Sequence, residues 1–167
     1  WPSSLSFVWT IKVFGFFLPL LRFQNVVAHC ANVLLLYLLL QAVFDAVLGK
    51  MEATRSRHRW WAAIGALWFG LNPVAVYATA YLIQRSMLMA TGFSLISTYC
   101  LLRMFVADHT NRRAWGLMSS AAYLLAFLSK EHAILLPAVM MTMTRLILPG
   151  QVHRAQWRRI LVPIFSG

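Results

Sequence analysis

The stretch Asn25-Val-Val-Ala-His-Cys-Ala-Asn-Val-Leu-Leu-Leu-Tyr-Leu-Leu-Leu-Gln-Ala-Val-Phe-Asp-Ala-Val-Leu48 decides the fold class of this chain. It is almost entirely apolar, and it is longer than the about 20 helical residues that cross the hydrocarbon core of a bilayer. Gly49 and Lys50 follow it directly and end the apolar run. The stretch therefore predicts a transmembrane helix over residues 25–48.

Further apolar segments follow, separated by short polar loops. The run from 114 to 148 lies between two basic clusters, so we expect it to cross and return, with its turn at Ser129-Lys130-Glu131. The segment 4–15 is too short to cross and suits a helix at the membrane interface. The remaining predicted spans are 60–82, 86–106, 114–129 and 131–148. The prediction is an all-α integral membrane protein, a polytopic helix bundle with about five transmembrane helices and one N-terminal interfacial helix. It forms a single domain over 1–167, which we expect to be a piece of a longer protein.

Basic residues predict how the spans are oriented. Eleven of the fifteen Lys and Arg residues fall in three clusters, and short loops rich in Lys and Arg face the cytoplasm. Four basic residues remain on the opposite, outer side, where each needs a structural or functional reason. The cytoplasmic clusters are Lys50, Arg55, Arg57 and Arg59; Arg103, Arg112 and Arg113; and Arg145, Arg154, Arg158 and Arg159; the outer residues are Lys12, Arg22, Arg85 and Lys130.

Composition agrees with a membrane protein and excludes other classes. The chain is 60% hydrophobic and 11% charged, with a mean hydropathy of +0.68, whereas soluble domains are about 25% charged. A net charge of +11 raises the question of nucleic acid, but the charges lie in separate loops and form no single stripe, so we expect no nucleic-acid partner. Cys30 and Cys100 are expected at different depths, which disfavours a disulfide.

Polar residues cluster on one face of the first span. Asn25, His29 and Asn32 stand at i, i+4 and i+7, so their side chains share one helix face at the predicted outer end. Such a stripe either forms hydrogen bonds between helices or contacts a polar substrate. A metal site is disfavoured because no second His at ligand spacing accompanies His29. We expect the stripe to face protein, and we expect no metal and no cofactor.

A second group of polar residues lies at the predicted outer ends of the other spans. Arg85 follows Gln84 at the junction of the second and third spans, and Lys130 and Glu131 form the outer turn. Either these charges interact with lipid phosphates or with one another, for example in a salt bridge between Glu131 and Arg85, or the cations hold an anionic lipid headgroup. We expect Arg85, Lys130 and Glu131 to converge in one pocket.

Two other helix faces predict packing. Ala62, Ala66 and Gly70 repeat at four-residue spacing in the second span, which lets a neighbouring helix approach closely. Polar side chains on one face of the third span are expected to pack against protein; they are Thr91, Ser94 and Thr98.

Four motifs occur in an order that resembles a known family. They are Asn25-Val-Val-Ala-His29-Cys-Ala-Asn32-Val-Leu-Leu-Leu-Tyr, Leu71-Asn72-Pro73-Val74, Tyr81-Leu-Ile-Gln84-Arg85-Ser86 and Leu128-Ser129-Lys130-Glu131-His-Ala-Ile-Leu-Leu-Pro137. Together they resemble the membrane part of the transmembrane and tetratricopeptide-repeat O-mannosyltransferase-like family, especially its bacterial members, in the GT-C glycosyltransferase superfamily. The resemblance runs from Pro2 to about Pro149.

The resemblance implies a function and a location. Members of this family transfer a sugar from a polyprenyl-phosphate carrier to an acceptor on the outer or lumenal face. Arg85 and Lys130 would hold the carrier phosphate, Asn25, His29 and Gln84 would contact the sugar or shape the pocket, with Asn32 completing the polar stripe, and Glu131 would orient a cation. The expected location is the bacterial inner membrane, with the basic loops in the cytoplasm.

Two hypotheses follow, because the chain also departs from the family. The acidic pair that family members carry in their first outer loop is not in this sequence, and Trp1-Pro2 and Asn72-Pro73 stand where the family tends to have Arg-Pro and His-Pro. The catalytic residues are therefore unknown. The first hypothesis is a fragment of a GT-C-like glycosyltransferase that binds membrane lipid, including the polyprenyl-phosphate-linked sugar. The alternative is a catalytically degenerate relative that acts as an accessory or scaffold subunit beside other membrane subunits.

Overall fold

The computed structural model describes residues 8–9, 12, 18–48, 52–73, 81, 84–106 and 109–147. Most of the predicted interfacial helix over 4–15 lies outside the described residues. So do positions 74–80 and 82–83 of the predicted second span, and the arginines that follow Arg145.

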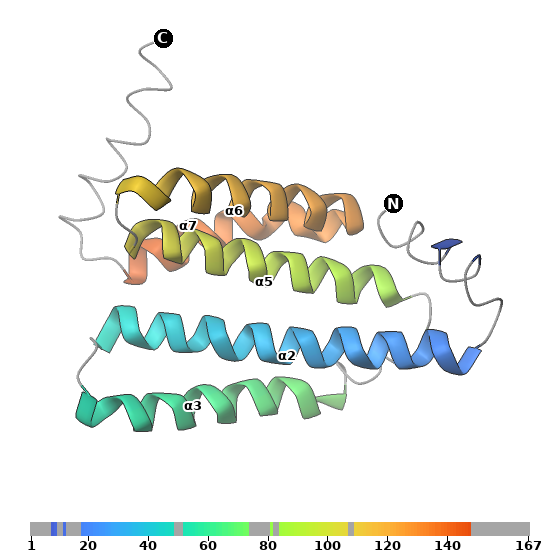
Figure 1. Ribbon diagram of the computed structural model, residues 1–167, viewed down its shortest axis with the longest axis horizontal. Helices are drawn as coiled ribbons and strands as arrows, with labels where there is room; N and C mark the ends of the chain where they lie inside the picture. The colour runs from blue at the N-terminus through green and yellow to red at the C-terminus, as the bar shows by residue number, and fades with distance from the viewer. Residues whose placement is uncertain are drawn as a thin grey trace, which may run out of the picture.

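The described part of the chain is all-α, which confirms the predicted fold class at this level. It contains five α-helices: α2 (Leu18–Leu48), α3 (Glu52–Leu71), α5 (Arg85–Val106), α6 (His109–Ser129) and α7 (Leu136–Ile147), with the 3-10 turn η2 (Glu131–Leu135) before the last one. Figure 1 shows the helices lying side by side with their axes nearly parallel. Helix α2 packs against both α3 and α5, and α5 packs against α6.

Helix α2 begins earlier than the sequence analysis predicts. It starts at Leu18 instead of residue 25, and it includes Pro19. Proline lacks a backbone N–H, but the first turn of a helix has no use for that donor, and the fixed φ of proline already suits a helix. Pro19 therefore starts α2 rather than separating it from the segment before.

The other helix boundaries follow from similar local chemistry. Helix α3 begins at Glu52 instead of residue 60 and ends at Leu71, because Asn72 precedes Pro73 and a residue in that position disfavours helical angles. Helix α5 begins one residue before the predicted third span. Helix α6 begins at His109, before the predicted residue 114, and ends at Ser129.

The chain reverses direction at Lys130, in agreement with the predicted turn. Lys130 is extended, with φ −157° and ψ 134°, and α6 and α7 run in opposite directions in Figure 1. The segment after the turn starts as the 3-10 turn η2 and becomes α-helical at Leu136. Pro137 follows at once, within the first helical turn, where its missing N–H is tolerated. The helix predicted over 131–148 is therefore split into η2 and α7.

Two described helices are long and apolar enough to cross a membrane, judged by length and composition: Pro19–Val47 in α2 and Arg85–Phe105 in α5. The sequence pattern predicts five such spans. Helix α3 starts with a charged segment, α6 has Arg112 and Arg113 near its start, and α7 has only 12 residues. These three helices therefore lack a long apolar stretch of the kind that α2 and α5 have.

Small residues allow α2 and α3 to approach closely. Ala62 is 0% exposed and Ala66 is 3% exposed. A Cβ placed on Gly70 would lie 2.9 Å from Cγ2 of Val33 on α2, closer than real Cβ contacts. The predicted ridge of small residues is thus confirmed as a packing surface, and α2 is its partner.

Paired serines connect α5 to α6. The Ser97 hydroxyl donates to the Ser119 carbonyl oxygen at 2.8 Å, and the Ser119 hydroxyl donates to the Ser97 carbonyl oxygen at 2.8 Å. Ser97 is 0% exposed, so both bonds form away from solvent. They also fix the register of the two antiparallel helices.

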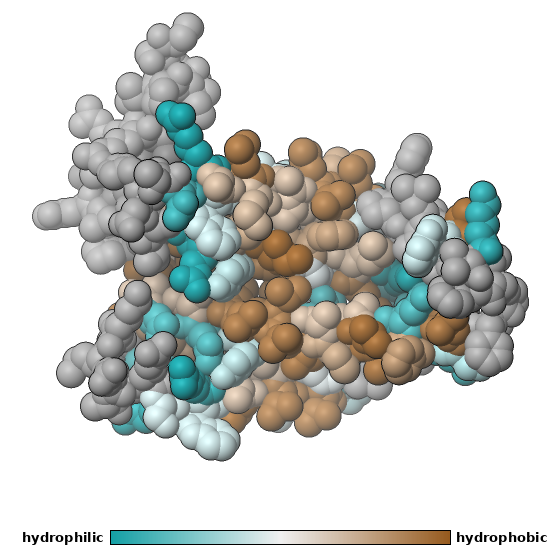
Figure 2. Space-filling view, in the orientation of Figure 1, coloured by the Kyte–Doolittle hydropathy of each residue, from teal (hydrophilic) through white to brown (hydrophobic). Residues whose placement is uncertain are grey.

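The surface of the bundle divides into three zones along the helix axes. Figure 2 shows hydrophobic residues over the middle of the helices and hydrophilic residues near both ends. Large apolar side chains are exposed on several helices, and they include Leu34, Trp68, Leu117, Leu124 and Leu146.

Candidate functional site

The predicted site residues gather at one end of the bundle. Helices α2 and α5 begin at this end, and α3 and α6 finish there, as Figure 1 shows on its right side. We call it the stripe end, because it contains Asn25 and His29. Asn32 binds Leu88 across α2 and α5, which run in the same direction, so His29 lies near the level of Arg85 and Asn25 lies about 6 Å beyond it.

The polar stripe of α2 faces protein, as predicted. Asn25 is 0% exposed, His29 8% and Asn32 4%. His29 Nε2 donates to the Gly70 carbonyl oxygen at 3.0 Å, and the His29 ring lies against Phe69, with the ring centroids 6.0 Å apart. Gly70 belongs to the last turn of α3, whose carbonyl groups lack partners in their own helix. His29 therefore joins α2 to the end of α3.

Asn32 joins α2 to α5 in the same way. Its Nδ2 donates to the Leu88 carbonyl oxygen at 2.9 Å. A Cβ added at Gly92 would lie 2.7 Å from Asn32 Oδ1, so the amide fits only because position 92 has no side chain. Gly92 was not among the predicted site residues. His29 and Asn32 thus form hydrogen bonds between helices, and contact with a sugar stays a prediction for the stripe.

Arg85 and Gln84 lie where α5 begins. Arg85 is half-buried and is the first residue of α5, and the Gln84 N–H donates to the Tyr81 carbonyl oxygen at 3.0 Å. A cation at a helix N-terminus opposes the helix dipole. Arg85 therefore does not stabilise α5 through the helix dipole.

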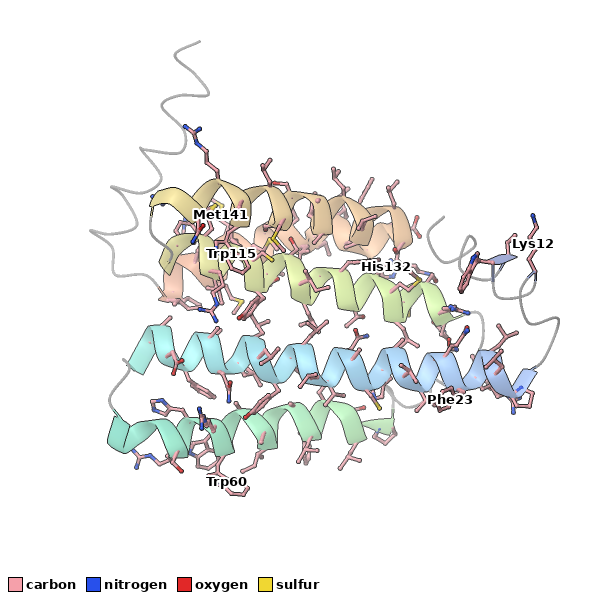
Figure 3. All side chains as sticks on the ribbon, viewed as in Figure 1. Lys12, Phe23, Trp60, Trp115, His132 and Met141 are labelled. Carbon is pink, nitrogen blue, oxygen red and sulfur yellow. The ribbon has the colours of Figure 1, made fainter. Side chains whose placement is uncertain are left out.

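Lys130 lines a cavity of about 450 Å³ between α2, α5 and the η2–α7 segment. Most of the lining is apolar, and Lys130 and His132 supply its cationic and titratable groups. Figure 3 places His132 toward the stripe end and Met141 toward the opposite end. The other lining residues are Leu39, Met87, Ala90, Thr91, Ser94, Leu95, Thr98, Ala133, Leu135, Leu136, Val139 and Met143.

Lys130 and Glu131 have different surroundings. Glu131 is exposed, and neither it nor Arg85 lines the cavity that contains Lys130. The predicted salt bridge between Glu131 and Arg85 is not formed in the described part of the chain. Lys130 is extended, whereas Glu131 is the first residue of η2, so the backbone conformation changes between these two neighbours.

Several residues of this cavity were not predicted as site residues from the sequence. Thr91, Ser94 and Thr98 were expected only to pack, yet all three line it. Their spacing along α5 already placed them on one face. The Thr98 hydroxyl donates to the Ser94 carbonyl oxygen at 2.8 Å, so that hydrogen is used within α5. His132 gave no signal beyond its place beside Lys130 and Glu131.

Carboxylates are sparse at the stripe end. Glu131 is near it, whereas Asp45 lies about 30 Å from Asn25 along α2. Within the described ranges, no three His, Cys, Asp or Glu side chains come together as metal ligands would. The described residues therefore place cations and hydrogen-bonding groups at this end without a pair of carboxylates.

Comparisons of the chain with models of protein families, with curated proteins and with solved structures found no match. The four motifs that resemble the GT-C superfamily therefore support a prediction about function and not an assignment.

Proposed function

We propose that this chain is the membrane-embedded part of a GT-C-like glycosyltransferase that binds a polyprenyl-phosphate-linked sugar at the stripe end. Lys130 carries the proposal, because it lines a cavity that is otherwise mainly apolar. A lipid phosphate has the same two parts, an apolar chain and an anionic group. Lysine acts as a compact point charge for phosphate.

The exposed apolar surface supports a membrane location. In the most apolar window of α2, only 17% of the residues are buried. The core helix of a soluble protein would instead bury such residues, and a soluble monomer rarely exposes a continuous apolar patch of more than a few hundred Å². The hydrophobic zone over the middle of the helices in Figure 2 lies between two hydrophilic ends, as in a protein that spans a bilayer.

The charges support one orientation. We call the end opposite the stripe end the basic end, and it carries Arg57, Arg103 and Arg113. Trp60 and Trp61 lie close to it and are 70% and 58% exposed, which suits the aromatic belt at a membrane interface. In the bacterial inner membrane, the basic end would face the cytoplasm and the stripe end the outer side.

The cavity suggests how a lipid carrier would bind. Its lining on α5 extends from Met87 to Thr98, about 16 Å along the helix axis. The chain of a lipid would lie along this lining, and its phosphate would meet Lys130 and His132. Arg85 begins α5 at the same end and would attract the same anion, while Asn25 and Gln84 would lie nearer the sugar.

The alternative is an accessory or scaffold subunit of a membrane complex. The missing pair of carboxylates favours it, because hydrolysis and transfer of sugars normally use acidic groups near the bond that changes. So does the exposed apolar face of α3, where Trp68 is 79% and Leu71 76% exposed. Other subunits would cover such a face in a complex.

Binding of a polyprenyl phosphate to the purified protein tests the proposal. Lys130→Gln should weaken binding by about 1.5–3 kcal/mol if Lys130 makes a charge-assisted bond to the phosphate, or roughly ten- to hundredfold in Kd. Arg22→Gln is the matched control, because Arg22 is an exposed cation near the same end and does not line the cavity. Equal binding by the Lys130 variant and the parent protein would favour the accessory subunit.

A further inference from the structure

Three arginines lie at the basic end of α5 and α6, where these two helices pack together. Arg103 lies in the last turn of α5, and Arg112 and Arg113 lie near the start of α6. Ser97 and Ser119 face each other across these antiparallel helices. Counting six residues from each serine toward the basic end leads to position 103 on α5 and to position 113 on α6. These two positions are therefore at the same level of the bundle. We call the surface formed by Arg103, Arg112 and Arg113 the arginine corner.

The described residues leave the positive charges of the arginine corner without a paired carboxylate. None of the three arginines forms an ion pair within the described part of the chain. Arg103 Nε and Nη2 donate to the Tyr99 hydroxyl oxygen at 2.9 and 2.8 Å, and the Arg103 guanidinium lies 5.2 Å from the Tyr99 ring centroid. Tyr99 thus orients this guanidinium but does not neutralise it.

Arg112 and Arg113 are placed unfavourably for the protein alone. The Nη2 atom of Arg112 is buried and has no hydrogen-bond partner among the described residues. A buried donor without a partner costs free energy. Both residues also lie near the positive end of the α6 dipole, where an anion would be stabilising and a cation is not. An anionic ligand at the arginine corner would satisfy the free donor and offset the repulsion.

An apolar stripe continues from the arginine corner along α6. Leu117 follows Arg113 by four residues, so it lies on the same face one turn further along, and it is 72% exposed. Leu124 and Leu128 continue that face and are 57% and 52% exposed. Figure 3 shows Trp115 near the basic end, and its ring meets that of Tyr99 at 6.5 Å. Cations at the end of an apolar face match a ligand with an anionic head and hydrocarbon tails.

We propose that the arginine corner binds the phosphate headgroup of an anionic membrane lipid, with the acyl chains along the exposed face of α6. The arginine fork pairs with phosphate through two parallel hydrogen bonds, and basic pockets at the cytoplasmic ends of helices bind anionic headgroups. The proposal rests on the membrane location proposed above. It involves a different end of the bundle from Lys130 and does not depend on a sugar donor.

Lipid binding to the full-length protein in an uncharged detergent tests the proposal. Native mass spectrometry would count bound phosphatidylglycerol and phosphatidylcholine during separate titrations. We expect phosphatidylglycerol to bind more tightly, and Arg112→Gln with Arg113→Gln to weaken its binding by about tenfold or more. The control is Arg57→Gln with Arg59→Gln, two exposed arginines of α3 near the basic end, and it should change the affinity by less than about twofold.

A soluble competitor, a charge-conserving variant and a flotation test separate the possible outcomes. Glycerol phosphate should not displace the lipid at equal concentration; displacement would mean that the corner binds phosphate without regard to the lipid tails. Arg112→Lys with Arg113→Lys keeps the charge and should retain part of the preference, which guards against a Gln variant that fails to fold. Equal loss in the α3 control, or equal binding of both lipids by the parent protein, would overturn the proposal. A protein that stays soluble without detergent and does not float with vesicles would refute the membrane location instead.

Discussion

Replacing Gly92 with Ala should destabilise the bundle through one identifiable contact. The new Cβ would lie 2.7 Å from Asn32 Oδ1, which is closer than real Cβ contacts, so the amide must move. Asn32 is 4% exposed, and its Nδ2 donates to the Leu88 carbonyl oxygen at 2.9 Å. Moving the amide therefore breaks a buried hydrogen bond between α2 and α5.

The expected cost follows from two opposing effects. Losing a buried hydrogen bond costs about 1–3 kcal/mol, although such bonds between membrane helices average about 0.6 kcal/mol with a maximum near 1.7. Alanine is a better helix former than glycine by about 1 kcal/mol. We expect a net destabilisation of about 0.5–1.5 kcal/mol, because steric displacement of Asn32 adds to the loss of its bond.

A double-mutant cycle identifies the contact responsible. In an Asn32→Ala background, the clashing amide is absent, so Gly92→Ala should be neutral or stabilising. Equilibrium unfolding in detergent, followed by circular dichroism at 222 nm, measures each step. Gly116→Ala is a control, because its Cβ would meet only the flexible Met104 Sδ at 3.1 Å. The same loss from Gly92→Ala with and without Asn32 would refute this account.

Three more predictions concern other contacts. His29→Leu should destabilise the protein by about 1 kcal/mol, because the Gly70 carbonyl loses its donor; unchanged unfolding in detergent would contradict that role. Gly70→Ala should push α3 away from α2, since the Cβ would lie 2.9 Å from Val33 Cγ2, and Val33→Ala should restore the lost stability, as thermal melts of the single and double variants would show. Ser97→Ala and Ser119→Ala should each cost about 1 kcal/mol, because each hydroxyl donates to the carbonyl oxygen of the other residue. The double variant should cost less than their sum, because the two hydroxyl oxygens also lie within hydrogen-bond distance of each other, at 3.3 Å; a fully additive loss would mean that they act separately.

Sequence patterns predicted the helices better than the contacts between them. Long apolar runs and the basic clusters identified the helical segments, and i, i+4, i+7 spacing placed Asn25, His29 and Asn32 on one protein-facing side. The start of α2 was predicted at residue 25, seven residues too late, although Pro19 in the first helical turn is compatible with a helix.

The candidate site was predicted only in part. The turn at Lys130 followed from chain reversal between basic clusters, but the extended backbone of Lys130 has no sequence signature. The cavity depends on how η2 and α7 lie against α5, and contacts between distant segments are not encoded in local spacing. Gly92 likewise matters only because Asn32 lies opposite it.

Labelling of introduced cysteines from either side of the membrane most directly tests the proposed membrane location and orientation of the bundle. In a background that lacks Cys30 and Cys100, single cysteines would replace Lys12 and Glu131, which are exposed near the stripe end, and Arg57 and Asn111, which are exposed near the basic end. An impermeant thiol reagent should label the first two in intact cells, and the last two only after the membrane is opened. Labelling of Arg57 or Asn111 positions from outside would contradict the orientation, and release of the protein from membranes without detergent would contradict the membrane location itself.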